Sequence, residues 1–168
     1  MTQPSLQGLF NSYPTDQAPC TRPYQNQCAI RLSLALNAEG TFTVNRRSYR
    51  EPLCPHQHAR GAEALASWLH SRRRLGRPQR FRDSAIAKDT LQSEGGIIFF
   101  KDCFSRPDYK GRIRQVGDHI DLWVSRARVR TYLSEALGQT VEPDRAFDAL
   151  TYDDPKNEAR EVWFWPLA

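Results

Sequence analysis

One stretch organises the first part of the chain: Asn26-Gln27-Cys28-Ala29-Ile30-Arg31-Leu32-Ser33-Leu34-Ala35-Leu36-Asn37. Its apolar residues, among them Ala29, Leu32 and Leu36, recur at the spacing of one helical face. Asn26 is a residue type that caps free backbone N–H groups at a helix start, and Asn37 to Gly40 ends the run. The pattern therefore predicts a helix whose first turn carries a cysteine.

Cys28 is the residue of chemical interest in this helix. It lies at the positive end of the helix dipole, which favours the thiolate, and the thiolate is the reactive form of cysteine. A free cysteine is also often a small buried residue that packs a helix start. The catalytic interpretation therefore needs a partner residue elsewhere in the chain.

Length and composition indicate a folded protein. The chain has 168 residues, with 39% hydrophobic and 11% aromatic residues, which predicts a single domain over 1–168. Residues 1–25 are expected to form an arm, irregular or briefly helical, packed on this core. The 24 lysines and arginines outnumber the 19 acidic residues, for a formal net charge of +5. A basic surface of this kind can bind nucleic acid, a membrane surface or an acidic wall polymer. Net charge alone does not distinguish among these partners.

No apolar run is long enough to span a membrane, and the first ten residues lack the pattern of a secretory signal. The four cysteines, Cys20, Cys28, Cys54 and Cys103, show no CxxC spacing. One disulfide among Cys20, Cys54 and Cys103 remains open in an oxidising compartment. His56 and His58 lie close to Cys54, but three potential ligands within five residues need a fourth from elsewhere, so an exposed loop is the preferred interpretation.

The rest of the chain predicts an α+β fold. Further helices are expected at Ala59–Leu75, Ser84–Ser93 and Arg126–Leu137, and strands at Thr41–Val44, Gly95–Lys101, Val116–Val124 and Glu161–Trp165. The segment from Asp102 to Arg114 is expected to be a polar loop. The arginine-rich run from Arg72 to Arg82 begins near the end of the second helix, where cations complement the dipole, so a solvated face explains it.

His119 is the histidine that best suits a cysteine nucleophile. In the strand Val116–Val124 it shares one face with Asp121 and Trp123, while the alternate residues form an apolar face. A cysteine nucleophile needs a base within hydrogen-bond reach, and the base needs a group that orients it. A helical cysteine followed far downstream by a histidine on a strand is the chain order of papain-like cysteine peptidases. The alternative is a polar histidine on a half-exposed strand.

Several stretches together resemble one family, the type VI secretion amidase effectors of the fourth family, which are small papain-like enzymes of the NlpC/P60 type. The matching stretches are Asn26–Ser33 with Leu36-Asn37, Ala62–Leu69 with Gly76 and Pro78, Gly96–Phe100, Gly117-Asp118-His119-Ile120-Asp121-Leu122-Trp123, and Glu161–Trp165. The resemblance implies N-terminal helices, the nucleophile helix first, packed on an antiparallel sheet. It also implies Cys28 as the nucleophile and His119 as its general base.

The third catalytic residue is where this sequence departs from the family. The family has an aspartate somewhat beyond the His-x-x-Leu-Trp motif, whereas Arg126 to Leu133 contains no acid. Asp121 is the leading substitute, since it shares the face of His119. If a longer loop folds back, the alternatives are Glu135, Asp144 and Asp148, and an Asn, a Gln or a backbone carbonyl also serves this role.

The resemblance further implies an antibacterial toxin that cuts the peptide stems of peptidoglycan between D-glutamate and diaminopimelate. It would be secreted by the type VI apparatus, act in the periplasm of the target bacterium and be neutralised by a cognate immunity protein. It needs no metal or organic cofactor, no nucleic acid and no membrane insertion. Arginines such as Arg31, Arg112 and Arg114 are expected to hold the free carboxylates of the stems.

Two other functions remain open at this stage. A deamidase or transglutaminase-like toxin acting on a protein would keep Cys28 and His119 and change only the substrate. A basic nucleic-acid-binding module built on Arg72 to Arg82 would not need Cys28, and it would bind with a steep dependence on salt.

Overall fold

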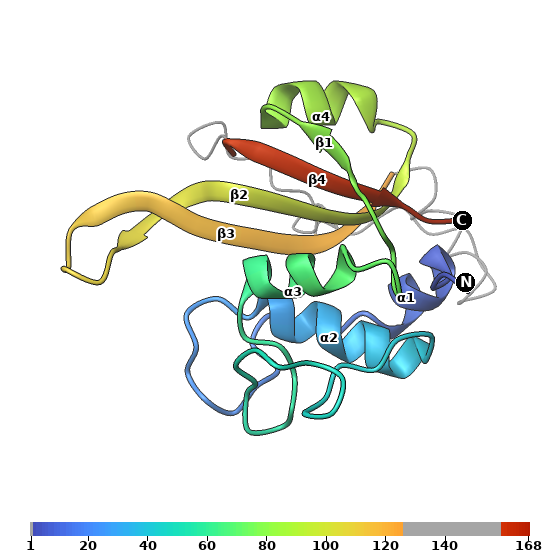
Figure 1. Cartoon of the computed structure of the whole chain (residues 1–168), viewed down its shortest axis with the longest axis horizontal. Helices are drawn as coiled ribbons and strands as arrows, with labels where there is room; N and C mark the ends of the chain where they lie inside the picture. Colours follow the sequence, from blue (N-terminus) through green and yellow to red (C-terminus); the bar gives the residue numbers. More distant parts are fainter. Residues whose placement is uncertain (1, 126–158) are drawn as a thin grey trace.

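The computed structural model describes residues 2–125 and 159–168 as helices on both sides of a four-stranded antiparallel sheet (Figure 1). The elements in chain order are α1 (Leu6–Ser12), α2 (Cys28–Glu39), α3 (Ala62–Leu69), β1 (Gln79–Phe81), α4 (Ser84–Thr90), β2 (Gly95–Pro107), β3 (Ile113–Val124) and β4 (Glu161–Pro166). The expected α+β class is confirmed. No helix within the described residues is long and apolar enough to cross a bilayer.

The sheet has the strand order β1-β4-β2-β3, with β4 and β2 in the middle. Ile97 of β2 is paired with Leu122 of β3 on one side and with Trp165 of β4 on the other. The apolar runs predicted for these two central strands therefore fill both faces of the sheet. Strand β3 lies at one end of the described sheet, so its outer edge is free to meet a helix.

Two apolar cores cover the two faces of the sheet. The larger core joins α1, α2 and α3 to one face and includes Leu32, Leu65 and Phe99. The smaller core lies on the opposite face, under α4, and includes Phe100 and Phe164. Figure 1 shows α1, α2 and α3 together on one side of the sheet and α4 on the other. Because α2 belongs to the larger core, its N-terminus is brought to β3.

Helix α2 forms where the sequence predicts it. The Asn26 side chain accepts a hydrogen bond from the Cys28 backbone N–H at 3.0 Å, and Gly40 ends the helix in the left-handed region at φ 94°. The strand predicted at Thr41–Val44 is wrong. Asn37 binds both backbone groups of Val44, with Oδ1 2.6 Å from the Val44 nitrogen and Nδ2 3.1 Å from its oxygen. This side chain replaces the neighbouring strand that the segment would otherwise need.

The second predicted helix is shorter than expected. It begins at Ala62 rather than Ala59, because Ala59 forms an isolated β-bridge with Leu53. It ends at Leu69, and the chain then turns so that the Leu75 nitrogen donates to the Leu69 oxygen at 3.1 Å. The last six residues of the expected helix form turns instead.

The polar loop predicted from Asp102 to Arg114 is wrong, because β2 and β3 continue through most of it as a long hairpin. The tip is held by Asp108, whose carboxylate accepts hydrogen bonds from the backbone of Lys110 at 2.8 Å and of Arg112 at 3.0 Å. The same carboxylate forms ion pairs with Arg112 at 3.1 Å and with Arg114 at 3.3 Å. The far end of the hairpin is exposed on both faces. Its sequence therefore lacks the alternation of apolar and polar residues that marks a half-buried strand.

The N-terminal arm is helical at α1, and its start lies against the end of the chain. The Ser5 side chain caps α1 at the Gly8 nitrogen, and the Leu6 nitrogen donates to the Ala168 oxygen at 2.9 Å. The short helix expected near Ser84 is confirmed as α4, with Asp83 as its cap. Strand β1 was not predicted. The helix expected at Arg126–Leu137 lies outside the described residues.

Candidate active site

The N-terminus of α2 meets the edge of the sheet at β3, and this junction brings Cys28 to His119. Cys28 is the first residue of α2 and is 7% exposed. His119 lies in β3, and its imidazole forms side-chain hydrogen bonds with both Cys28 and Asp121. Three residues predicted as a site from sequence are therefore in direct contact.

The imidazole of His119 lies between two partners. Its Nε2 is 3.2 Å from Oδ2 of Asp121, which leaves Nδ1 as the ring nitrogen for the Cys28 sulfur. Asp121 is fully buried, and the ring of His119 lies against Phe100 of β2 with 6.3 Å between the ring centroids. The ring is thus held from both ends and along one face.

These contacts decide the charge state of His119. Burial lowers the pKa of its imidazole, but the hydrogen bonds to Asp121 and Cys28 and the electrostatic interactions with these two side chains outweigh that effect. The net result raises the pKa of His119 from 6.5 to about 10. His119 is therefore an imidazolium at neutral pH, ready to give a proton to a leaving group.

Asp121 is itself held in place by two further donors. Its Oδ1 accepts a hydrogen bond from the Tyr13 hydroxyl and one from the Leu122 backbone nitrogen, the latter at 2.8 Å. Burial, together with the charge of Asp121, raises the pKa of Tyr13 well above its usual value, so the phenol keeps its proton and donates. The carboxylate of Asp121 thus has fixed partners on both oxygens.

Sequence analysis gave Tyr13 no role in the site. Its hydroxyl contact with Asp121 joins residues 108 positions apart in the chain, so no local pattern could have indicated it. Nearby, the guanidinium of Arg31 lies over the Tyr13 ring at 4.8 Å from its centroid. Tyr13 is therefore fixed by Arg31 on its face and by Asp121 at its hydroxyl.

The arginines expected to hold substrate carboxylates do not line the pocket beside Cys28. Arg31 is 6% exposed and donates to Oε1 of Gln17 at 2.9 Å and to the Pro14 oxygen at 3.1 Å. Arg112 and Arg114 pair with an aspartate at the hairpin tip. All three arginines are thus engaged within the protein, and two other arginines, Arg60 and Arg106, line the pocket beside Cys28.

A pocket of about 740 Å³ opens beside Cys28, a volume typical of small-ligand sites. Its lining combines apolar side chains with a few polar and charged ones. The lining residues are Pro23, Tyr24, Gln25, Asn26, Cys28, Pro52, Arg60, Gly61, Ala62, Ala64, Phe104, Arg106 and Asp118. Cys28 therefore lines a cavity large enough for part of a peptide.

All four cysteines are free thiols in the structure, so the disulfide left open by the sequence is not formed. Cys54 contacts His58, with 3.6 Å between its sulfur and Nδ1. Among residues 2–125 and 159–168, no three His, Cys, Asp or Glu side chains gather as they would around a metal ion.

Part of the arginine-rich run from Arg72 to Arg82 has structural partners. The guanidinium of Arg74 stacks over Trp68 at 3.6 Å from the ring centroid. Arg80 lies over Trp163 at 4.4 Å and pairs with Glu161 at 3.4 Å. These contacts support the structural interpretation of this run over a nucleic-acid interface.

The other candidates for the third catalytic residue, Glu135, Asp144 and Asp148, lie outside the described residues. Within the described part of the chain, Asp121 is the carboxylate in contact with His119. The geometry thus supports the substitute preferred from sequence.

A helix that begins with a cysteine and packs on an antiparallel sheet carrying a histidine defines the papain-like NlpC/P60-type fold. Within this class, residues 24–165 match the family "Type VI secretion system (T6SS), amidase effector protein 4", or Tae4. The chain belongs to this family, whose members are peptidoglycan amidase effector toxins. The resemblance expected from the sequence is confirmed.

Solved structures show the same fold. The Tae4–Tai4 effector–immunity complex from Salmonella Typhimurium aligns with a TM-score of 0.61 at 14% identity, covering 99% of this chain and 100% of that one. The corresponding complex from Enterobacter cloacae aligns with a TM-score of 0.57, at the same identity and coverage. Tae4 alone from Enterobacter cloacae gives a TM-score of 0.55 at 12% identity, covering 99% of this chain and 98% of that one. No curated protein sequence matches the chain.

Proposed function

We propose that Cys28, His119 and Asp121 form the catalytic triad of a peptidoglycan amidase, and that the whole chain works as one amidase domain. The observation that carries the proposal is the continuous line of contacts from Cys28 through His119 to Asp121. Membership of the amidase effector family supports it independently. Cys28 is the nucleophile, His119 moves the proton, and Asp121 orients His119.

The reaction is acyl transfer to water. The Cys28 sulfur attacks the amide carbonyl and forms a covalent thioester, while His119 gives its proton to the leaving amine. The positive end of α2 stabilises the negative charge that develops on the carbonyl oxygen. Water then attacks the thioester, with His119 taking its proton, and the free carboxylate leaves as Cys28 is restored.

The substrate proposed is the peptide stem of peptidoglycan, cut between D-glutamate and diaminopimelate. The Cys28 pocket is large enough for such a peptide, and the described part of its lining carries Arg60 and Arg106 for carboxylates. The family name supports delivery by a type VI apparatus, and its peptidoglycan substrate supports action in the periplasm of the target bacterium. The Tae4–Tai4 complexes support a cognate immunity protein as the partner in the producing cell.

Digestion of purified peptidoglycan tests the proposal. The wild type should release stems cut after D-glutamate, identified by mass spectrometry, and Cys28→Ala should release none. Cys103→Ala is the matched control, because Cys103 belongs to the smaller core on the other face of the sheet. Equal digestion by wild type and Cys28→Ala, or intact peptidoglycan with both, would overturn the proposal.

A further inference from the structure

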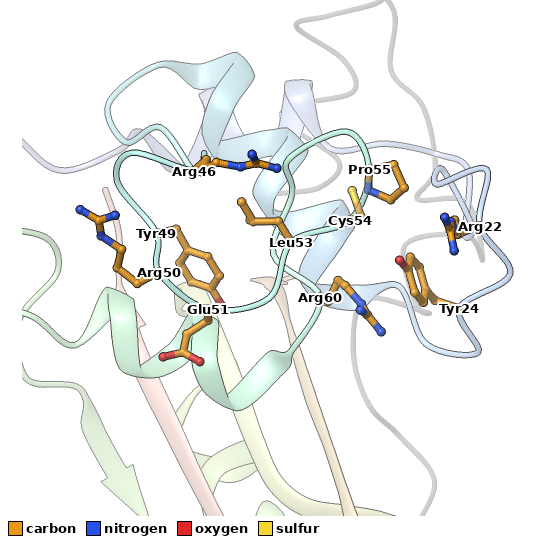
Figure 2. Close-up of a pocket in the computed structure, with 10 residues that line it drawn as sticks. All are labelled: Arg22, Tyr24, Arg46, Tyr49, Arg50, Glu51, Leu53, Cys54, Pro55 and Arg60. Carbon is orange, nitrogen blue, oxygen red and sulfur yellow. The ribbon is translucent and has the colours of Figure 1, made fainter.

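A second cavity, of about 660 Å³, lies next to the Cys28 pocket and is rich in arginine (Figure 2). We call it the arginine pocket and define it by Arg22, Arg46, Tyr49, Arg50, Glu51 and Arg60 among its lining residues. Its residues come from the segment before α2 and from the loops between α2 and α3. The triad does not use this cavity.

The arginine pocket carries an excess of positive charge. Its lining has four guanidinium groups and one carboxylate, that of Glu51. Within residues 2–125 and 159–168, none of these arginines forms an ion pair with an acidic side chain, and Arg60 instead stacks over Tyr24 at 4.4 Å. Guanidinium groups bind carboxylates through paired hydrogen bonds, so the pocket suits an anionic ligand.

Tyr49 gives the pocket a second feature that points to a ligand. Its side chain is 2% exposed, yet its hydroxyl has no hydrogen-bond partner in the structure. A buried hydroxyl without a partner costs about 1–3 kcal/mol. Burial, and then the charge of Glu51, raise the pKa of Tyr49, so the phenol keeps its proton and remains a donor. A ligand oxygen that accepts from this hydroxyl would remove the cost.

The arginine pocket adjoins the Cys28 pocket. Tyr24 and Arg60 line both cavities, and their stacked side chains form the boundary between them. Figure 2 shows these two side chains next to each other, with Arg22 close to Tyr24 and Arg46 on the facing loop. A peptide whose amide lies at Cys28 can therefore extend past Arg60 into the arginine pocket.

We infer that the arginine pocket is a substrate subsite that binds free carboxylates of the same peptide whose amide is cut at Cys28. The inference rests on the proposed amidase function and extends it by naming the groups that hold the rest of the stem. Arg22 and Arg46 lie on opposite sides of the pocket (Figure 2), so each binds a separate carboxylate of the peptide, and the Tyr49 hydroxyl is a further donor. Because the contacts are ionic and the arginines exposed, salt weakens them.

The test measures peptide binding to the full chain carrying Cys28→Ala, which holds the substrate without cutting it. The probe is a purified peptidoglycan tetrapeptide, compared by calorimetry with the same peptide after amidation of its free carboxylates. Arg46→Gln and Tyr49→Phe are each expected to raise the Kd for the acidic peptide about tenfold. They are expected to leave the weaker binding of the amidated peptide unchanged.

Two controls separate binding from folding. Arg47→Gln removes a neighbouring exposed arginine that does not line the pocket, and its Kd should match that of the parent. Tyr49→Phe should keep or raise the melting temperature, since its hydroxyl has no hydrogen bond to lose and is costly to bury. Inorganic phosphate serves as a second probe, and competition with the acidic peptide would support an anion site at these arginines.

The possible failures are distinguishable. If wild-type protein leaves peptidoglycan intact, the amidase proposal falls and the subsite falls with it. If the wild type cuts peptidoglycan while Arg46→Gln and Tyr49→Phe bind the acidic peptide as well as Arg47→Gln does, the subsite alone is overturned. Equal affinity of the parent for the acidic and amidated peptides would overturn it too.

Discussion

The hydroxyl of Tyr13 donates a hydrogen bond to Oδ1 of Asp121, and both side chains are buried. The contact links the segment after α1 to the strand that carries His119, so the orientation of the imidazole depends on the N-terminal arm. Tyr13 also precedes residues 24–165, the range that matches the amidase effector family. Asp121, the partner of His119, is thus held by a residue that lies outside the matched range.

Tyr13→Phe tests whether this hydroxyl positions the triad. Without it Asp121 loses a buried donor and holds His119 less firmly, so kcat should fall about tenfold. KM should stay the same, since Tyr13 does not line the Cys28 pocket. Steady-state kinetics on soluble peptidoglycan fragments would measure the two constants separately.

Tyr109→Phe is the matched control for this change, because Tyr109 is 89% exposed at the hairpin tip. It should leave both kcat and KM unchanged. A Tyr13→Phe protein with wild-type kcat, or with a raised KM alone, would contradict a positioning role.

Asp121→Asn should change the pH dependence of cleavage. The pKa of His119 is about 10 in the folded protein, so its protonated form is lost only as the pH rises through that value. Replacing the Asp121 carboxylate with an amide removes a negative charge that stabilises the imidazolium, which lowers this pKa. The alkaline limb of kcat/KM should therefore move to lower pH, and kcat should fall about a hundredfold or more.

Asp89→Asn, an exposed change on α4, controls for the loss of one negative charge. Its pH profile should superimpose on that of the wild type. An alkaline limb that stays near the wild-type position in Asp121→Asn would show that another group sets the charge of His119.

The nucleophile helix and the strand of His119 were predictable because the apolar residues of each recur at a regular spacing, which places them on one buried face. The period of two in β3 placed His119 and Asp121 on one face, and the structure joins them at 3.2 Å. Cys28 and His119 lie 91 positions apart, as their numbers show, so their contact came from the family resemblance rather than from any local pattern.

Other features carried no periodic signal. The long hairpin of β2 and β3 was taken for a loop, because its exposed end is polar on both faces. The arginine pocket is built by irregular loops, where neighbours such as Arg46 and Arg47 look alike in sequence and only one lines the cavity. In such segments the position of a side chain is set by individual contacts, which spacing does not encode.

Asn37→Ala should destabilise the fold without touching the site. The Asn37 side chain satisfies both the N–H and the C=O of Val44, a residue that is fully buried. Alanine would leave these two groups unpaired, at an expected loss of about 2 kcal/mol in the free energy of unfolding. Urea denaturation followed by tryptophan fluorescence would measure it, and Asn11→Ala, an exposed change in α1, should cost less.

Gly96→Ala should be among the most damaging single-methyl changes in the sheet. Gly96 lies in β2, paired with Trp123 on one side and Pro166 on the other. An added Cβ would lie 2.0 Å from the backbone oxygen of Trp165, an atom that cannot move aside without displacing β4. We expect a loss of about 3 kcal/mol in the free energy of unfolding, measured by urea denaturation.

The same methyl group has room at Gly61, where the nearest atom to an added Cβ is the Ala64 Cβ at 3.7 Å. Gly61→Ala should therefore cost no more than about 1 kcal/mol, the price of a poorer cap at the start of α3. The difference between the two variants separates a steric clash from the general effect of replacing a glycine. Equal stabilities would mean that β4 is not held against Gly96 as the register of the sheet requires.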